Sequence, residues 1–354
     1  MKRLITIVIC GVVFYGCASH KVCNESLTDQ MYIHQQVQRE LDSLEAFTRD
    51  TLAVLSERLT TTDSLARENA FRFREYRRNL ATYAIPDTVY FCGQSFIFDN
   101  SDKRERLEKE FLLLVSNQAQ LLLYFRRSEE FFPIIERKLN EAGMPDDLKY
   151  VAVIESALKT RAMSYAGASG PWQFRAGTAR EQGIKSTGQV DMRRDIEMST
   201  QAAIDKFNDL IEQFGDWALA LAAYNMGENG LVRRMKEQGV TDYFDLWLPQ
   251  ETEAYLFRAI VVKLIFENPG HYGILLDQRT YWERVQKDTI TVTFRSGLNV
   301  KRVADWCEST FREIKLLNPE VTKDAWGSGT FTIKLPFGTR QLFEQGLADL
   351  KRKK

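Results

Sequence analysis

The chain opens with a short positive start followed by an apolar run. Lys2 and Arg3 precede the mostly apolar residues 4–15, and a glycine then leads into Cys17. The run is too short to cross a bilayer, which needs roughly twenty apolar residues, and the order of charge and apolar run is typical of a secretory signal. We therefore expect residues 1–16 to be a lipoprotein signal peptide that is cut before Cys17, although the two residues before the glycine are bulkier than usual. The alternative is an ordinary signal with an incidental cysteine.

Residues 24–78 are polar with an apolar stripe at three- and four-residue steps, or multiples of them. This spacing places apolar side chains on one face of a helix and leaves a charged face opposite. We expect residues 17–85 to form a helical stalk, which serves as a spacer or as a short coiled coil for self-association; the alternative is a helix packed on the main domain. The stripe consists of Ile33, Val37, Leu41, Leu44, Leu55 and Leu59.

A break at Pro86 starts a helical lead-in, which we place at 86–130. Within it, residues 89–98 are expected to be extended and residues 101–123 to form a helix. A second apolar helical face runs from Phe131 to Leu139 and is closed by a Gly-Met-Pro turn.

The central part alternates helices with turn clusters. Asp146 and Asp147 are expected to cap a strongly apolar helix that reaches Glu155. Residues 165–174, with sequence YAGASGPWQF, predict a loop. Asp195 can cap the next helix, which Gly215 is expected to end, and the small apolar residues of 216–227 predict a buried helix ended by its terminal glycine.

After residue 281 the pattern changes to that of a small separate module. Apolar residues alternate over 290–294 and again over 331–335, as in half-buried strands, and two helical stretches lie between them at 300–307 and 310–317. We expect a βααβ module at 282–354 whose lysine-rich end is solvated. The fold class predicted for the whole chain is mainly α, with a minor β contribution (α+β).

Composition narrows the chemistry. The 354 residues are 44% hydrophobic and carry a formal net charge of +0, so there is no basic footprint for nucleic acid. The three histidines are far apart in sequence, and the five cysteines include no CxxC pair. We therefore expect no histidine-dependent triad, no metal site, no cofactor and no nucleic-acid partner.

One acidic residue has an unusual setting. Glu155 stands among apolar neighbours, which disfavour its charged form, raise its pKa and suit it to donate a proton near neutrality. Taken singly, a helical glutamate is more often solvated or paired. Further polar or aromatic candidates stand at the end of this helix, in the glycine-containing loop and at the end of a buried helix: Ser156, Trp172, Gln173, Tyr224 and Asn225.

Several motifs occur in a fixed order: IESA, then GASGPWQF with GTA at 177–179, then AAYNMG, and finally LPQETEAYLFR at 248–258. Together they resemble the catalytic domain of the lytic transglycosylases, lysozyme-like enzymes that cleave peptidoglycan. The resemblance covers about 130 to 270 and implies a lysozyme-like helical catalytic domain at 131–275. More weakly, EIKLLNP and KLP resemble a degenerate LysM-like unit in the C-terminal module, which either binds glycan or only supports the catalytic domain.

The resemblance implies a role for each matching residue. Glu155 is the single catalytic acid and base, and no metal takes part. The residues implied to bind or orient the substrate are Ser156, Trp172, Gln173, Tyr224, Asn225, Glu251 and Tyr255. One departure is that Arg175 and Ala176 stand where many members have Met-Pro.

The implied reaction cleaves the MurNAc–GlcNAc β-1,4 bond and leaves a 1,6-anhydroMurNAc end. The implied partners are peptidoglycan strands and a bacterial membrane, to which the chain is anchored through Cys17. The resemblance implies that this is the outer membrane and that the protein faces the periplasm. Two alternatives remain. A hydrolytic muramidase would need a second carboxylate, for which Asp191 and Asp195 are candidates, and a non-catalytic peptidoglycan-binding lipoprotein would carry a degenerate site.

Overall fold

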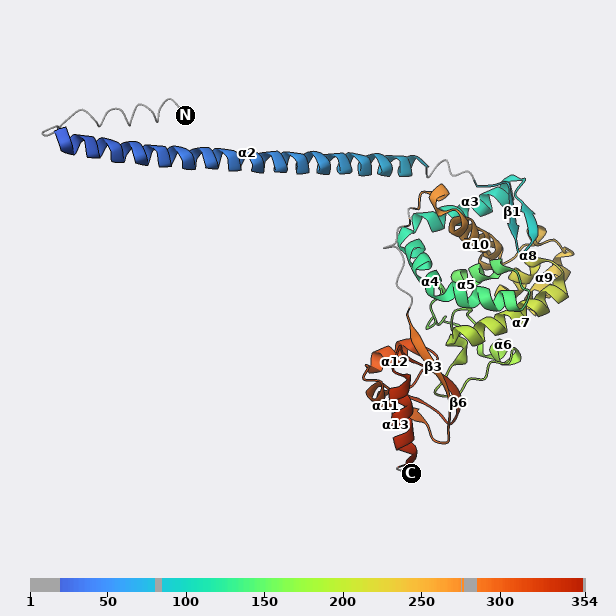
Figure 1. The fold of residues 1–354 in the computed structure, drawn as a ribbon. Helices are drawn as coiled ribbons and strands as arrows, with labels where there is room; N and C mark the ends of the chain where they lie inside the picture. The colour runs from blue at the N-terminus through green and yellow to red at the C-terminus, as the bar shows by residue number, and fades with distance from the viewer. Residues whose placement is uncertain (1–19, 80–84, 275, 277–284, 353–354) are drawn as a thin grey trace. The chain divides into compact units, whose positions relative to one another are not determined.

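The computed structural model describes residues 20–79, 85–274, 276 and 285–352. The chain divides into two compact units, one ending at Thr82 and the other beginning at Tyr83 (Figure 1). The proposed signal peptide and Cys17 lie outside the described residues. The predicted fold class is confirmed, since most described residues are helical and the sheets are small.

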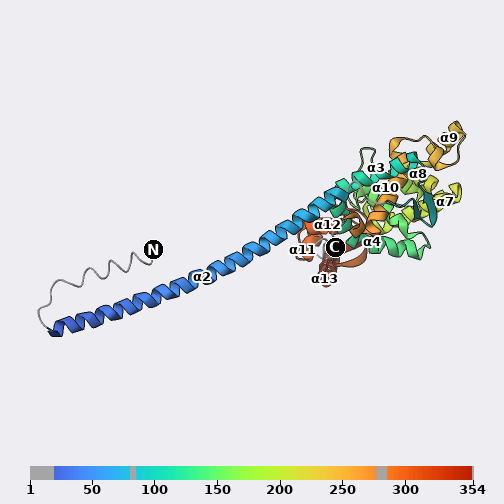
Figure 2. The same ribbon diagram turned by 90° about the horizontal axis from the view of Figure 1, so that it is seen from above.

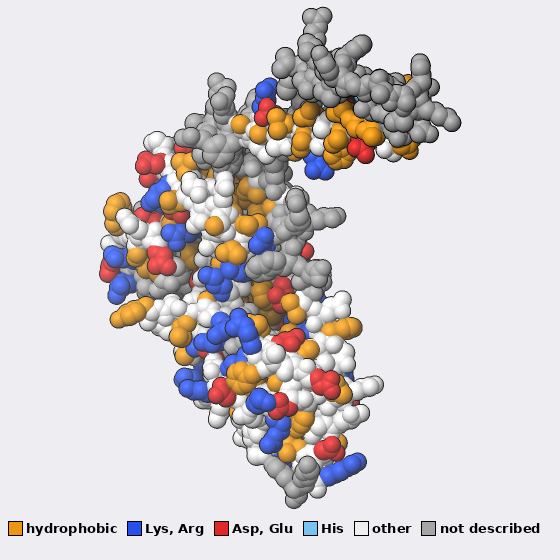
Figure 3. Space-filling view, turned by 90° about the vertical axis from the view of Figure 1, so that its left-hand side faces the viewer, with side chains coloured by type: hydrophobic (Ala, Val, Ile, Leu, Met, Phe, Trp, Pro, Cys, Tyr) orange, Lys and Arg blue, Asp and Glu red, His pale blue; other side chains and the backbone are white. Residues whose placement is uncertain are grey.

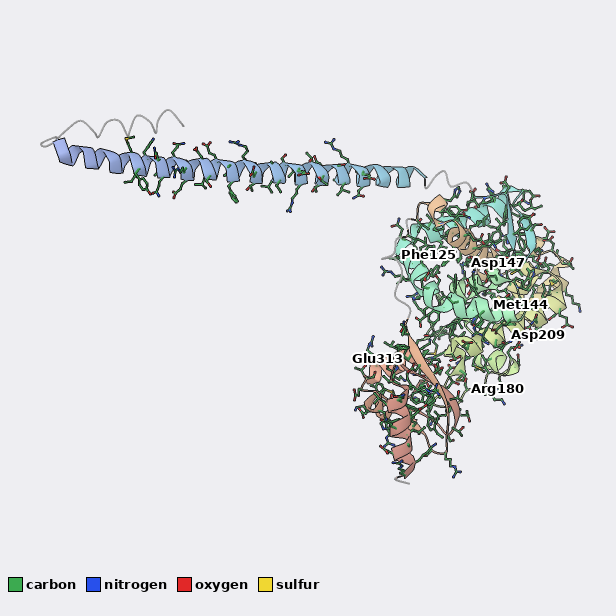
Figure 4. All side chains as sticks on the ribbon, viewed as in Figure 1. Phe125, Met144, Asp147, Arg180, Asp209 and Glu313 are labelled. Carbon is green, nitrogen blue, oxygen red and sulfur yellow. The ribbon has the colours of Figure 1, made fainter. Side chains whose placement is uncertain are left out.

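The first unit is a single helix, as predicted, within the bounds expected for the stalk. Helix α2 spans His20–Asn79 without a break (Figures 1 and 2). Every side chain described in it, over 31–70, is exposed, and Figure 4 shows these side chains standing out all round the helix. No helix in the described part of the chain is both long and apolar enough to cross a bilayer.

The second unit begins with a short antiparallel hairpin followed by helices. The expected helix over 101–123 is two helices, because Asn117 ends the first and caps the second by accepting a hydrogen bond from the Gln120 amide at 3.1 Å. The elements are β1 (Thr88–Phe91), β2 (Gln94–Ile97), α3 (Ser101–Ser116), α4 (Gln118–Glu141), η1 (Asp146–Leu148), α5 (Lys149–Ser156), α6 (Ala176–Glu181), η2 (Met192–Arg194), α7 (Ile196–Phe214), α8 (Trp217–Met226), α9 (Glu228–Gln238), η3 (Tyr243–Asp245), α10 (Gln250–Glu267) and η4 (Pro269–Tyr272).

Helices α8 and α10 form the centre of the helical body. Both are apolar on nearly all sides, as expected for helices surrounded by protein, and α10 packs against α3, α5 and α8. The caps expected for two helices are present. Asp195 accepts a hydrogen bond from the Met198 amide at 2.9 Å, and Gly215 and Gly227 end α7 and α8.

The cap expected from Asp146 and Asp147 is wrong. Neither side chain caps η1 or α5. Asp147 instead accepts a hydrogen bond from the Cys92 amide at 2.7 Å and pairs with Lys263 at 2.5 Å. Its carboxylate therefore joins the hairpin to α10, a long-range contact that local spacing does not reveal.

The C-terminal module has the predicted strand, two helices and strand. Strands β3 (Lys287–Phe294) and β6 (Gly329–Pro336) pair antiparallel, with Ile290 opposite Ile333. The helices are α11 (Val300–Trp306) and α12 (Phe311–Leu317), and the two-residue strands β4 (Leu298–Asn299) and β5 (Ala325–Trp326) pair beside them.

The lysine-rich end is exposed as expected at Lys351 and Arg352, the part of it that the structure describes, but it stands at the end of a helix that was not predicted from the sequence. Residues Arg340–Arg352 form helix α13, whose Phe343 is fully buried against Trp306. The expected lead-in at 86–130 packs on the later helices, since Glu110 on α3 is buried and accepts a hydrogen bond from Arg258 on α10 at 2.9 Å.

Candidate active site

Glu155 stands at the C-terminal end of α5. The helix ends directly after Ser156 because Ala157 and Leu158 adopt left-handed backbone conformations, with φ of 56° and 58°. Such angles are uncommon for residues other than glycine and persist where the surroundings fix them. Here Arg127 donates a hydrogen bond to the Ala157 carbonyl at 3.1 Å. The strained turn therefore ends α5 one residue after Glu155 and fixes the position of this glutamate.

Tyr255 on α10 and Glu155 form the central contact of the site. The Tyr255 hydroxyl donates a hydrogen bond to Oε1 of Glu155, and the tyrosine is only 4% exposed. Burial raises the pKa of Glu155 to about 7, the hydroxyl bond opposes that rise, and the charge of Glu251 adds to it. Near neutral pH a substantial fraction of Glu155 therefore carries a proton.

Tyr224 and Asn225 end α8 on the same side of the helical body. The Tyr224 ring stacks on Phe207 at 4.6 Å between centroids, and its hydroxyl donates to the Trp172 carbonyl at 2.9 Å. Burial and the charge of Glu155 both raise the pKa of Tyr224, so the phenol stays protonated. The Asn225 amide oxygen accepts a hydrogen bond from Thr252 on α10 at 2.7 Å, which leaves its NH₂ group as the donor of this side chain.

Gln173 lies in the predicted loop in a left-handed conformation, with φ of 49°. Its side-chain amide donates to the Gly170 carbonyl at 2.7 Å, which leaves the side-chain oxygen as an acceptor. The loop is tied to α8 through the bond from Tyr224, so Gln173 shares a neighbourhood with Glu155 and Tyr224.

Two residues expected to contact substrate differ from that expectation. Trp172 is 1% exposed and donates to Thr200 at 3.0 Å, so it is part of the core and does not line a cleft. The Ser156 hydroxyl is buried and lies 2.8 Å from the Pro171 carbonyl, to which it donates. It therefore holds the loop against α5.

The remaining predicted residues fall at the edge of the site. Glu251 is exposed in the first turn of α10, and Arg175 is exposed just before α6. Sequence reasoning missed Thr252, although it stands inside the LPQET motif, because its role depends on a partner on α8. No group of three or more His, Cys, Asp or Glu side chains suited to a metal occurs within the described residues.

Replacement of Tyr255 tests the electrostatic account of the site. Because the Tyr255 hydroxyl bond favours the ionised form of Glu155, Tyr255→Phe is expected to raise the pKa of Glu155 further above about 7. Carboxyl ¹³C NMR of Glu-labelled protein measures this titration directly. The control is Tyr243→Phe, which removes another buried hydroxyl that binds backbone carbonyls of α10. A fall in the pKa of Glu155, or an equal rise in the control, would contradict the account.

Part of this chain is similar to a known protein family. Residues 132–246 match the model of the Transglycosylase SLT domain. The chain is 30% identical over 240 residues to the membrane-bound lytic murein transglycosylase D of Escherichia coli K12, an alignment that covers 66% of this chain and 52% of that protein. The chain therefore spans about half the length of this curated relative.

Two solved structures are similar to parts of this chain. A lytic transglycosylase Slt mutant from Pseudomonas aeruginosa is 22% identical with a TM-score of 0.32, covering 43% of this chain and 26% of that one. The 70 kDa soluble lytic transglycosylase of Escherichia coli is 20% identical with a TM-score of 0.36, covering 51% and 32%. The family match thus covers residues 132–246, and this segment is similar to the transglycosylase SLT domain.

Proposed function

We propose that this chain is a lytic transglycosylase that cleaves the MurNAc–GlcNAc β-1,4 bond of peptidoglycan and leaves a 1,6-anhydroMurNAc end. The observation that carries the proposal is the burial of Glu155 beside the Tyr255 hydroxyl at the end of α5, a setting that raises its pKa to about 7. A carboxyl group with such a pKa can donate a proton and then accept one at neutral pH. The match of residues 132–246 to the SLT domain supports the same reaction.

A single carboxyl group is sufficient for this chemistry. Protonated Glu155 gives its proton to the glycosidic oxygen as the bond from that oxygen to C1 of MurNAc breaks. The carboxylate then takes the proton of the C6 hydroxyl while the C6 oxygen bonds to C1, which closes the anhydro ring and restores the protonated acid. No water is consumed. The Asn225 NH₂ group can steady the reacting sugar through its dipole.

The hydrolytic alternative needs a second carboxylate across the cleft. Both acids considered for it are engaged elsewhere. Asp191 pairs with Arg193 at 2.8 Å, and Asp195 caps α7 and pairs with Lys334 at 2.5 Å. Glu251, whose charge acts on Glu155, is the acid to replace next if hydrolysis is found.

Glu155→Gln is expected to lower the release of anhydro-ended muropeptides by at least about 100-fold, because the amide cannot transfer the proton. The protein is incubated with purified peptidoglycan and the products are read by mass spectrometry. Glu212→Gln on the exposed face of α7 is the matched control and should retain activity. Near-normal turnover by Glu155→Gln would refute the assignment. Reducing-ended products from the parent protein would indicate hydrolysis. Binding to peptidoglycan without any product would favour the non-catalytic alternative, and Arg175 would then be the first residue to test as the cause of inactivity.

We also propose the division of the chain into a signal peptide, a stalk, a lead-in, a transglycosylase domain and a module, with a lipid anchor at Cys17 in the outer membrane facing the periplasm. The charged start, apolar run and cysteine of the sequence support the anchor, as does the description of the curated relative as membrane-bound.

Cys17→Ala should remove the lipid and release the protein from the membrane fraction, because the proposed anchor is then lost. Membrane fractionation and metabolic labelling with a radioactive fatty acid measure the two effects. Cys23→Ala, a nearby cysteine change, should leave both unchanged. Continued membrane association and labelling of the Cys17→Ala protein would exclude this anchor.

The exposed stripe of α2 supports self-association through a second copy of this chain. Its members follow each other at steps of four, four and three residues. This eleven-residue period favours a coiled coil with a slight right-handed supercoil. Most are large apolar side chains with half or more of their surface exposed, such as Leu44 at 60% and Leu59 at 73%, and hydrophobic side chains are visible on the described part of α2 in Figure 3. Thr48 and Leu52 fill the gap in the stripe predicted from the sequence, so that it runs through Ile33, Val37, Leu41, Leu44, Thr48, Leu52, Leu55 and Leu59.

The polar member of the stripe fits this interpretation. Thr48 donates its hydroxyl to the Leu44 carbonyl at 2.9 Å, so its methyl group remains for packing. A straight helix with a regular apolar stripe packs best against another helix with the same repeat. A second copy of this chain supplies such a helix. Proposed anchors at Cys17 would hold both N-termini at one membrane, which favours a parallel pair and raises the local concentration.

Cysteine cross-linking in membranes tests the parallel pair. In a Cys23→Ser background, Leu44→Cys places a thiol on the stripe, whereas Arg49→Cys places one on the other side of α2. Mild oxidation should give a disulfide-linked dimer for Leu44→Cys, and at least about tenfold less for Arg49→Cys, on a non-reducing gel. Equal dimer from both, or none from Leu44→Cys, would contradict the proposal.

A further inference from the structure

Residues 189–195, here called the connecting segment, contact the C-terminal module along their backbone. The Asp191 amide donates to the Glu320 carbonyl at 2.8 Å, and the Thr322 amide donates to the Gln189 carbonyl at 2.8 Å. Between them Val190 pairs with Val321 as an antiparallel bridge. The Val190 side chain is 1% exposed and belongs to the hydrophobic core of the module. A segment of the helical body thus completes the packing of the module.

A buried ion cluster lies at this junction. Lys334 on β6 pairs with Asp195 at 2.5 Å and with Glu320 at 3.0 Å, and each of the three residues is less than a tenth exposed. Burial alone would lower the pKa of Lys334, but the two carboxylates raise it overall, so the ammonium stays charged. Loss of one partner from such a cluster leaves an uncompensated buried charge, which disfavours separation of the two parts.

The other side of the connecting segment holds the loop that carries Gln173. Arg193 donates from Nη1 to the carbonyls of Gly167 at 2.8 Å and of Phe174 at 2.9 Å, which lie on either side of the loop tip. The Asp191 carboxylate holds the guanidinium in place by accepting hydrogen bonds from Nε at 2.9 Å and from Nη2 at 2.8 Å.

The approach between loop and segment is very close. A Cβ atom added at Gly170 would overlap the carbonyl oxygen of Arg193, and Arg194 donates to the Ser169 hydroxyl at 3.2 Å. The loop conformation, including the left-handed Gln173, therefore depends on where the connecting segment lies.

We propose that Arg193 is a positioning residue of the active site and that the C-terminal module holds the Gln173 loop in its binding conformation through the connecting segment. The inference rests on the proposed function, since the loop matters through the substrate that it contacts. It gives the module a role in catalysis that does not require glycan binding by the module itself.

The expected signature is in KM. If the clamp is weakened, substrate must order the loop as it binds, so the affinity falls while the bound complex still reaches the same reactive geometry. Arg193→Lys keeps the positive charge but cannot span both carbonyls and Asp191. It is expected to raise KM by about tenfold and to change kcat by less than about twofold.

The kinetic test uses the full chain with soluble glycan strands, and the released anhydro ends are counted by mass spectrometry. Arg302→Lys, an exposed change on α11, is the matched control and should leave both parameters unchanged. A lower kcat at unchanged KM would mean only a smaller folded fraction and would overturn the proposal, as would unchanged kinetics in Arg193→Lys.

A second measurement does not depend on turnover. Hydrogen exchange read by mass spectrometry should show faster exchange of residues 165–174 in Arg193→Lys. It should also be faster in Val190→Ala, which leaves a small cavity in the module core and does not touch the loop. Exchange in α8 should stay slow in both variants. If the parent made no anhydro product, the proposed function would fail while this coupling could still be demonstrated; unchanged exchange in the loop would refute the coupling itself.

Discussion

The hydrogen bond between Tyr255 and Glu155 is the interaction on which the rest of the site depends. A carboxyl group at the end of α5 would ordinarily be ionised at neutral pH, and burial among apolar residues opposes that ionisation. The hydroxyl of Tyr255 offsets part of the burial, so the pKa stops near 7, where a group serves equally as acid and base. Stronger burial would raise the pKa further and disfavour the carboxylate that acts as the base. A stronger bond from Tyr255 would lower the pKa and disfavour the protonated form that acts as the acid.

This balance requires α5, α8 and α10 to be fixed to one another. Helices α8 and α10 achieve it with apolar surfaces on nearly every side, and polar side chains that they carry inward are hydrogen-bonded to the other helix or to the loop that carries Gln173. The bond between Thr252 and Asn225 and the bond from Tyr224 to the Trp172 carbonyl are examples. Polar groups enclosed in a core are costly unless they are bonded, so these pairs also define the packing of the helices.

Local signals in the sequence predicted much of this arrangement. The cap at Asp195, the glycine ends of α7 and α8 and the alternating strands of the module depend on neighbours within a few residues, and each was predicted. The setting of Glu155 was also expected from its apolar surroundings. Asp147, Trp172 and Thr252 were misjudged or missed because the partner that gives each its role lies far along the chain. Patterns of local spacing contain no information about such pairs.

The connecting segment is the clearest case of such long-range dependence. In the sequence its acids stand out only as helix caps or as candidates for a second catalytic carboxylate. In the structure Asp191 serves Arg193 and Asp195 serves Lys334, so both charges are used to join parts of the fold. A buried ion cluster contributes little net stability compared with an apolar core, but it tolerates far fewer alternative arrangements. A junction of this kind therefore suits a module whose proposed task is to fix the position of a loop, since position is what the paired charges specify.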